Sequence, residues 1–380
     1  MNIKVLLSIA ILALYSINNF ASEGSPVQTV EKILEDAVDE KRRLSDLVGL
    51  GAIVIQDGKV VGLSVSGERK KGSDSFVSLD DKWHIGSITK SFTATMIARL
   101  IERGDLDWGT SIEDVFPDES KINLEWKSVT LRDLLTHTSG VARDFSPFIF
   151  FKNPEAGAAR MKARETAVKN VLAKKPETTP GHTFMYSNIG YTIAGVMAEK
   201  KTGIPWENLI MQEVFAPLGI KSGGFGVPND SEDKLDQPWG HKNILGFKIS
   251  TKQDNSPILG PAGTIHISLY DLALYASEHL KGLKGRGTIL EKESFHRLHS
   301  PNLNNYAYGW VIGSPKGLDI GNVHWHNGSN GTWYSLLAIF PDTNSLIVIT
   351  SNDGKFQSAQ QASWEIIKRL AEPLAVSHNM

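Results

Sequence analysis

The sequence predicts an α/β (α+β) fold, with an antiparallel sheet flanked by helices and built from both termini. Runs rich in β-branched residues occur at 50–68 and again at 322–353, and the stretch between them is mostly helical. Turn residues join neighbouring strand runs directly, which favours antiparallel pairing over a doubly wound parallel sheet. We therefore expect a mixed α/β domain formed by 23–86 plus 265–380, with a mainly helical domain inserted at 87–264.

The first residues, MNIKVLLSIAILALYSINNFASEGS, have the three parts of a secretory signal peptide. Lys4 precedes an apolar run from Val5 to Leu14, and small residues follow near Ala21. That run is short for a membrane-spanning helix. We expect a signal peptide at 1–22 and an exported protein, periplasmic or secreted, without stable membrane insertion after cleavage. The alternative is an uncleaved N-terminal anchor.

Composition excludes several classes of function. The chain has no cysteine, which excludes disulfides, thiol catalysis and Cys-ligated zinc. It carries 40 Lys and Arg against 42 Asp and Glu, a net charge of −2, with no basic stripe. Nucleic acid and anionic membranes are therefore not expected partners. Oligomeric state is left open by the sequence.

The elements follow from periodicity and turn signals. A surface helix is expected at 28–44, and Asp57-Gly58 joins the first two strands in a hairpin. Further helices are expected at 87–103, 130–136, 158–174, 189–202 and 205–216. The Gly/Asp/Asn/Pro-rich region 221–260 is expected to form long loops. Strands at 322–330, 332–341 and 344–353 precede a last helix at 357–371.

The stretch HIGSITKSFTATMIARL places Ser87 and Lys90 one turn apart at the start of an amphipathic helix. The helix N-terminus favours developing negative charge, and desolvation lets a lysine lose its proton, so the pair can act as nucleophile and base. The alternative is an ordinary N-cap serine. A second match, Ser231 to Lys234, lies in a polar loop that could not bury a lysine.

Two further segments carry candidate chemistry. Tyr186 and Asn188 precede a helix. A phenol beside a cationic lysine loses its proton more easily and can then shuttle protons between nucleophile and leaving group, and the amide can hold the lysine and a substrate carbonyl. The alternative is a helix cap with a core tyrosine. On the HWHNGSNG strand, Gly328 would let a substrate backbone lie close. The N–H of Ser329 would form an oxyanion hole with the N–H of Ser87.

These three motifs, in this order, resemble the serine beta-lactamase and penicillin-binding protein superfamily. The likeness is greatest to its class C-type branch, which includes D-aminopeptidases, D-Ala-D-Ala carboxypeptidases and related esterases. Further phrases agree: LLTHTSGV (134–141), PLGI (217–220), GPAGTIHISLYDLALY (260–275) and YGW (308–310). The resemblance covers roughly 45–370 and implies a beta-lactamase/transpeptidase-like fold.

The resemblance also implies roles for individual residues. Ser87 would be the acylated nucleophile, Lys90 its base and Tyr186 a general base or proton shuttle. Asn188 would bind substrate, and the Ser329 amide would stabilise the oxyanion. His137 matches a phrase without an agreed catalytic role and is taken as structural.

His326 departs from the family pattern, because beta-lactamases and transpeptidases of this kind usually carry a lysine there. With a reference pKa near 6.5, a histidine is largely neutral at pH 7. Loss of the fixed charge weakens the case for carboxylate-bearing substrates and favours the peptidases and esterases, in which His-x-Gly is a known variant.

We therefore expect an exported serine hydrolase that forms an acyl-enzyme with a D-amino acid peptide, amide or ester, without cofactor or metal. Its substrate would be a small molecule or short peptide, including cell-wall fragments. Beta-lactamase or D-Ala-D-Ala carboxypeptidase activity is the enzymatic alternative, and a slowly deacylating penicillin-binding sensor is the non-enzymatic one. A metallohydrolase would instead use the histidines of the C-terminal third: His296, His299, His324 and His326.

Overall fold

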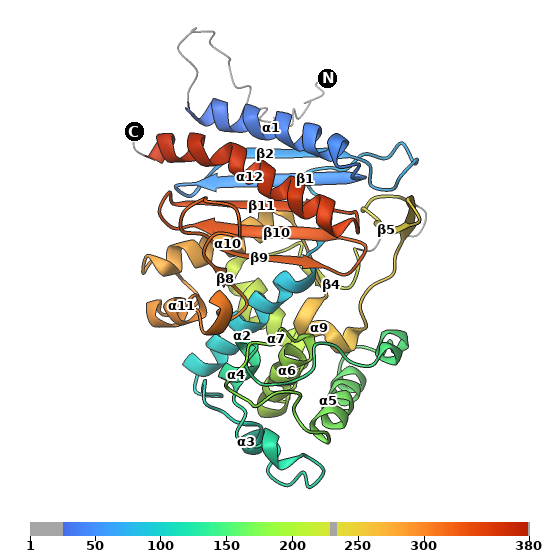
Figure 1. Ribbon diagram of the computed structural model, residues 1–380, viewed down its shortest axis with the longest axis vertical. Helices are drawn as coiled ribbons and strands as arrows, with labels where there is room; N and C mark the ends of the chain where they lie inside the picture. Colours follow the sequence, from blue (N-terminus) through green and yellow to red (C-terminus); the bar gives the residue numbers. More distant parts are fainter. Residues whose placement is uncertain (1–25, 229–233, 379–380) are drawn as a thin grey trace, which may run out of the picture.

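The structure is a computed structural model that describes residues 26–228 and 234–378. One six-stranded antiparallel sheet, in the order β2-β1-β11-β10-β9-β8, dominates the upper half of the molecule (Figure 1). The predicted signal peptide lies outside the described residues, as does Ser231 of the second Ser-x-x-Lys match. The predicted α+β class is confirmed. The strands of this sheet are β1 (Gly49–Gln56), β2 (Lys59–Gly67), β8 (Val311–Ile312), β9 (His324–Ser329), β10 (Tyr334–Phe340) and β11 (Ser345–Ser351).

Strands from opposite ends of the chain pair in the middle of this sheet. In the β1–β11 pair, Ala52 lies opposite Ile349 and Ile53 opposite Val348. Successive side chains alternate between two hydrophobic cores, as the period of two requires. Ala52 and Ile349 pack into one core, and Ile53 and Val348 into the other. The sheet therefore separates two apolar layers.

Helices cover both faces of the sheet. Helices α1 (Pro26–Leu44) and α12 (Phe356–His378) lie side by side on the outer face and close the smaller core (Figure 1). Helix α10 (Leu269–Leu283) packs against the other face, on β1, β10 and β11. Helix α10 was not among the helices expected from the sequence. Among the described residues, no helix is both long and apolar enough to cross a membrane.

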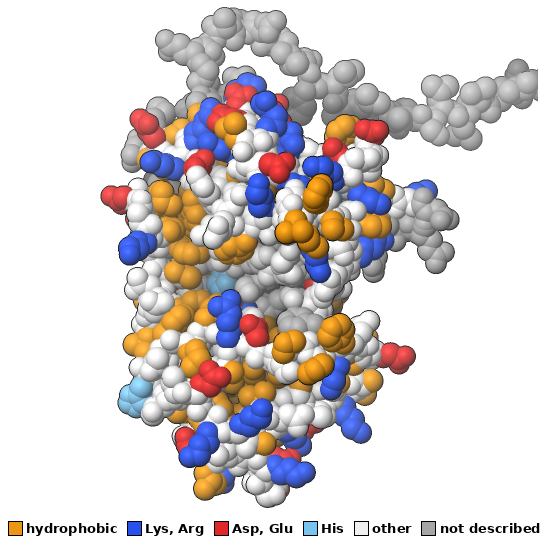
Figure 2. Space-filling model, turned by 45° about the vertical axis from the view of Figure 1, so that its right-hand side comes forward, with side chains coloured by type: hydrophobic (Ala, Val, Ile, Leu, Met, Phe, Trp, Pro, Cys, Tyr) orange, Lys and Arg blue, Asp and Glu red, His pale blue; other side chains and the backbone are white. Residues whose placement is uncertain are grey.

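The lower half of the molecule is helical, and a hollow crosses the waist between the two halves on the face shown in Figure 2. Helix α2 runs at the join, packed against α6 and α9. The expected helix 205–216 is α7 followed by one π-helical turn at Met211–Phe215. The helices of this half are α2 (Thr89–Glu102), α3 (Ile112–Val115), α4 (Leu131–Leu135), α5 (Ala158–Leu172), α6 (Asn188–Thr202), α7 (Trp206–Ile210), α8 (Ala216–Leu218), α9 (Gly260–Gly263) and α11 (Lys292–Leu298).

The region 221–260 is more regular than its composition predicted. It contains the hairpin β5 (Gly240–Ile244) and β6 (Phe247–Thr251), and a strand β4 (Gly224–Phe225). The expectation of long loops was therefore wrong for the hairpin. Leu245 and Gly246 both have positive φ at the tip of this hairpin. Leucine is not typical of such turns, which favour Asn, Asp or Gly at this position. Strand β4 joins β3 (Lys82–His84) and β7 (Ile265–Ser268) in a small second sheet.

Candidate active site

Ser87 lies where the chain passes from β3 into α2. A single 3₁₀ turn, η1 (Gly86–Ile88), leads into the helix, and Ser87 is partly exposed while its neighbours are buried. The side chain therefore reaches a cleft of about 670 Å³. The cleft is lined by Ser87, Arg143, Phe184, Tyr186, Asn188, Asn304, Tyr306, Val311, Trp325, His326, Asn327, Gly328, Ser329 and Phe356. Six of the seven predicted site residues line it, and the seventh, Lys90, lies directly behind Ser87.

Lys90 is completely buried, and its Nζ has three polar neighbours. Nζ lies 3.0 Å from Ser87 Oγ, 2.6 Å from Asn188 Oδ1 and 2.8 Å from the carbonyl oxygen of Ala262. Burial holds the pKa of Lys90 well below its usual 10.5; nearby Asp144 opposes this shift and Arg143 adds to it. A lysine that acts as a base must be neutral, and the surroundings of Lys90 favour the neutral amine.

Asn188 is held from two sides at the first turn of α6. Its Nδ2 donates to Asp144 Oδ1 at 2.6 Å, which fixes the amide so that Oδ1 faces Lys90. Ser187, the N-cap, accepts from the N–H of Gly190 and donates to the carbonyl of Ala142. Ser187 is therefore the helix cap that the alternative predicted, and the contact to Lys90 belongs to the next residue, Asn188.

Tyr186 lies between Lys90 and His137. Its hydroxyl hydrogen-bonds to Ser87, and Lys90 Nζ is 4.9 Å from the ring centroid. Burial raises the pKa of the phenol above its usual 10, so the tyrosine is protonated. The sequence analysis expected a cationic lysine to make this phenol more acidic; here the lysine is itself driven toward the neutral form. The residue is placed to relay a proton, not to begin as a phenolate.

His137 supports the site from behind. It is buried with φ +60°, and its ring packs on Tyr186 at a centroid distance of 4.3 Å. Its Nδ1 accepts the N–H of Ser187 at 3.1 Å, and its carbonyl accepts the N–H of Met185. Burial holds its pKa well below 6.5. The ring and backbone of His137 therefore position the Tyr186 segment, in keeping with a structural role.

The backbone of β9 lies against the backbone of η1. A Cβ built on Gly328 would overlap the carbonyl oxygen of Ile85 and lie 2.5 Å from the amide nitrogen of Ser87. One built on Gly86 would overlap the amide nitrogen of Ser329. Two glycines, one on each segment, thus bring the Ser87 and Ser329 amides to one place. Gly328 serves this contact between segments of the chain, whereas the sequence analysis expected it to make room for substrate.

His326 is buried and neutral. Its Nδ1 lies 2.5 Å from the carbonyl oxygen of Asn327, so this nitrogen carries the proton and Nε2 accepts from the hydroxyl of Tyr306 at 3.1 Å. Burial, with a smaller contribution from the nearby Lys90, lowers its pKa to about 3. The expected loss of positive charge at this position therefore holds in the folded protein.

Several residues of the site escaped the sequence analysis. Gly86 and Ala262 contribute only backbone, although Ala262 lies in the phrase GPAG that helped to carry the family resemblance. Asp144 orients Asn188 from a loop without a motif, and Tyr306 stands two residues before the YGW phrase. The phrases 260–275 and 308–310 were the available signals, but neither indicates which atom points into the cleft.

The histidines of the metallohydrolase alternative do not converge. His299 Nδ1 lies 2.9 Å from His324 Nδ1, and His299 Nε2 lies 2.9 Å from His279, in a buried chain that Thr95 ends. His326 bonds to Tyr306 instead. Within 26–228 and 234–378, no three His, Asp or Glu side chains form a group that could hold a metal ion.

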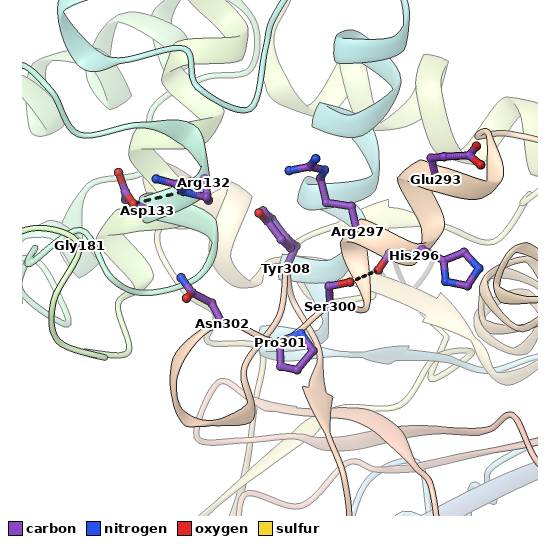
Figure 3. Close-up of a pocket in the computed structure, with 10 residues that line it drawn as sticks. All are labelled: Arg132, Asp133, Gly181, Glu293, His296, Arg297, Ser300, Pro301, Asn302 and Tyr308. Carbon is purple, nitrogen blue, oxygen red and sulfur yellow. Dashed lines mark hydrogen bonds and ion pairs between the residues drawn. The ribbon is translucent and has the colours of Figure 1, made fainter.

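His296 lies in a separate surface pocket of about 630 Å³ between α4 and α11 (Figure 3). Arg132 and Asp133 line one side of it, and Arg297 and Glu293 line the other. None of its lining residues lines the catalytic cleft. His296 therefore lies outside the cleft that Ser87 lines.

The sequence model of the family described as Beta-lactamase matches residues 34–371. The chain belongs to the beta-lactamase family. It is 25% identical over 340 residues to penicillin-binding protein 4 of Amycolatopsis lactamdurans, covering 84% of each chain. Among solved structures, D-amino acid amidase from Ochrobactrum anthropi SV3 aligns with TM-score 0.73 at 21% identity, covering 92% of this chain and 99% of that one. A class C beta-lactamase from Rhodobacter sphaeroides aligns with TM-score 0.72 at 19% identity, covering 90% and 99%. The resemblance stated from the motifs is confirmed at the level of family and fold.

Proposed function

We propose that this beta-lactamase family member is a serine hydrolase that forms an acyl-enzyme on Ser87. The observation that carries the proposal is the bonding of Lys90. A neutral amine has two N–H donors and one lone pair. Two of the three neighbours of Nζ, Asn188 Oδ1 and the Ala262 carbonyl, can only accept. Its lone pair is therefore left for the hydroxyl of Ser87, which is the arrangement a general base needs.

Acylation follows from this arrangement. Ser87 Oγ attacks the substrate carbonyl and its proton passes to Lys90 Nζ, 3.0 Å away. Negative charge develops on the carbonyl oxygen, which the Ser87 and Ser329 amides would stabilise, each donor contributing about 3 kcal/mol. Both groups are held in place before the reaction, because the Gly86–Gly328 contact fixes the two backbones.

The leaving group needs a proton, and Tyr186 is placed to deliver it. Its protonated hydroxyl bonds to Ser87, so it can give its proton to the departing nitrogen or oxygen and recover one from Lys90. In deacylation, water replaces the leaving group and the same relay runs in reverse. His137 and Tyr306 act through packing and hydrogen bonds on the residues that react.

We favour D-amino acid amides, short D-amino acid peptides and small esters as substrates. Neutral His326 places no fixed cation on β9, and the fold is shared with a D-amino acid amidase. The second candidate is a carboxylate-bearing substrate, such as a beta-lactam or a D-Ala-D-Ala peptide. Arg143 favours it, because this exposed guanidinium lines the cleft 5.5 Å from the Tyr186 ring centroid.

A substrate panel on the purified protein tests the proposal. The turnover of four kinds of substrate is measured for the wild type and for Ser87→Ala: D-amino acid amides, p-nitrophenyl esters of short acids, a D-Ala-D-Ala peptide and nitrocefin. We expect turnover of amides or esters that Ser87→Ala abolishes, with an acyl adduct on Ser87 by mass spectrometry. Activity that survives Ser87→Ala refutes the mechanism. A single stoichiometric burst without turnover would instead establish the slowly deacylating sensor.

Export belongs to the proposal as well. Lys4, the hydrophobic segment at 5–14 and the small residues near Ala21 fit a signal peptide, and therefore a protein that works in the periplasm or outside the cell. N-terminal sequencing of protein recovered from a periplasmic extract tests this, since cleavage near residue 22 is expected.

A further inference from the structure

A second cavity, of about 340 Å³, lies beside the catalytic cleft between α5 and the segment 141–152. Its walls are mainly apolar and include Trp126, Val141, Phe145, Ile149 and Val171. Its volume is within the range of small-molecule binding sites, and nine of its 16 lining residues are apolar. Nothing in the proposed reaction uses this cavity.

The cavity is lined by more basic than acidic side chains. Lys152, Lys174 and Lys175 line it, and all three are exposed. Lys175 is paired with Glu125 at 3.1 Å, whereas Lys152 and Lys174 have no ion-pair partner among the described residues. The acidic lining residues are Glu177 and Asp144. Figure 2 shows hydrophobic side chains among lysine and arginine side chains on the lower half, where α5 lies.

Residues 142–144 form the wall between this cavity and the catalytic cleft. Ala142 and Asp144 line the cavity, and Arg143 lines the cleft. The same three residues hold the catalytic segment: Ala142 accepts from Ser187 Oγ, Arg143 from the N–H of Asn188, and Asp144 from Asn188 Nδ2. A molecule in the cavity would therefore touch the wall that positions the partner of Lys90.

We propose that this cavity is a second binding site for an apolar monocarboxylic acid, whose hydrocarbon body fills the cavity and whose carboxylate meets Lys152 and Lys174. Apolar walls favour the body through burial, and the unpaired ammonium groups favour a carboxylate over a neutral or cationic head group. Because the wall is shared, the bound acid changes the kinetics of Ser87. This last effect rests on the proposed function, whereas binding itself does not.

Calorimetric titration of the Ser87→Ala protein tests binding without any reaction. Three probes share a ten-carbon alkyl chain: decanoate and decyltrimethylammonium, each below its micelle concentration, and decanol, below its solubility limit. We expect one decanoate per chain, bound at least tenfold more tightly than the cation. The double variant Lys152→Glu/Lys174→Glu should weaken decanoate at least tenfold, and Lys162→Glu, an exposed lysine of α5 outside the cavity, should change it less than twofold.

Filling the cavity tests its location. Ala167 is buried in its wall, so Ala167→Phe should abolish decanoate binding, whereas Thr166→Phe on the exposed face of α5 should not; thermal melts confirm that both variants fold. Equal binding of decanoate and the cation, binding unaffected by Ala167→Phe, or no binding at millimolar decanoate would each overturn the site. Binding without any change in wild-type ester kinetics would overturn the coupling alone.

Discussion

Replacement of Gly328 by alanine tests whether the two backbone amides act as the oxyanion site. The added Cβ would lie 2.5 Å from the Ser87 nitrogen and overlap the Ile85 carbonyl, where ordinary contact begins at 3.4 Å. Both neighbours are backbone, which cannot rotate away. Strand β9 and η1 must therefore separate by about 1 Å, a displacement that can cost about 100-fold when it misplaces reacting groups.

The expected loss is that of one oxyanion donor. Without it, kcat falls by about 10²–10³, which corresponds to roughly 3–4 kcal/mol of transition-state stabilisation. Stopped-flow acylation with a p-nitrophenyl ester measures the step directly. KM should change less than kcat, because the amides act on charge that develops only in the transition state.

The control is Gly51→Ala in β1 of the same sheet. Its Cβ would meet the side chains of Leu269, Val65 and Trp83, which can shift, and no residue of the cleft. This variant should lose stability but keep its acylation rate within about threefold, since its effect is overpacking of the core alone. If Gly328→Ala folds and acylates as fast as Gly51→Ala, the two amides do not form the oxyanion site.

Three further predictions concern charge. Lys90→Met should reduce the acylation rate at least 1,000-fold. The variant should melt at the same or a higher temperature than the wild type, because burial disfavours the native ammonium. A lower melting temperature with retained activity would contradict this reasoning. His326→Lys should restore a cation on β9, alter the pH profile and raise nitrocefin turnover relative to ester; unchanged profile and preference would show that charge there is unimportant. The buried histidine chain should make the protein acid-sensitive. In the folded protein, the pKa values of His279 and His324 are lowered to about 3 and about 4. Below pH 6.5, the reference pKa of histidine, the unfolded chain therefore binds more protons than the folded one. Stability is therefore lost as pH falls below about 6.5, by up to about 1.4 kcal/mol per pH unit for each histidine. Urea midpoints at pH 7.5, 6 and 5 measure this loss, and His324→Asn should reduce the slope.

Local patterns were sufficient for most elements of the fold. Two runs rich in β-branched residues and the Asp57-Gly58 turn predicted the first hairpin, and helical periodicity predicted α1, α2, α5 and α6 to within a few residues. The errors fell where the local signal is weak or misleading. Helix α10 was not singled out, and the β5–β6 hairpin was read as loop because its turn uses Leu245-Gly246.

By itself, the sequence determined which groups could react. The motifs around Ser87, Tyr186 and His326 are short segments whose order and spacing can be read along the chain, and the family membership was inferred from them. Only the tertiary structure decided their states and partners. Lys90 finds an acceptor at Ala262, 172 residues away, and Gly86 meets β9 through a contact between backbones. Such contacts leave no periodicity in the chain, and burial, which sets the pKa of each group, exists only once distant segments pack together.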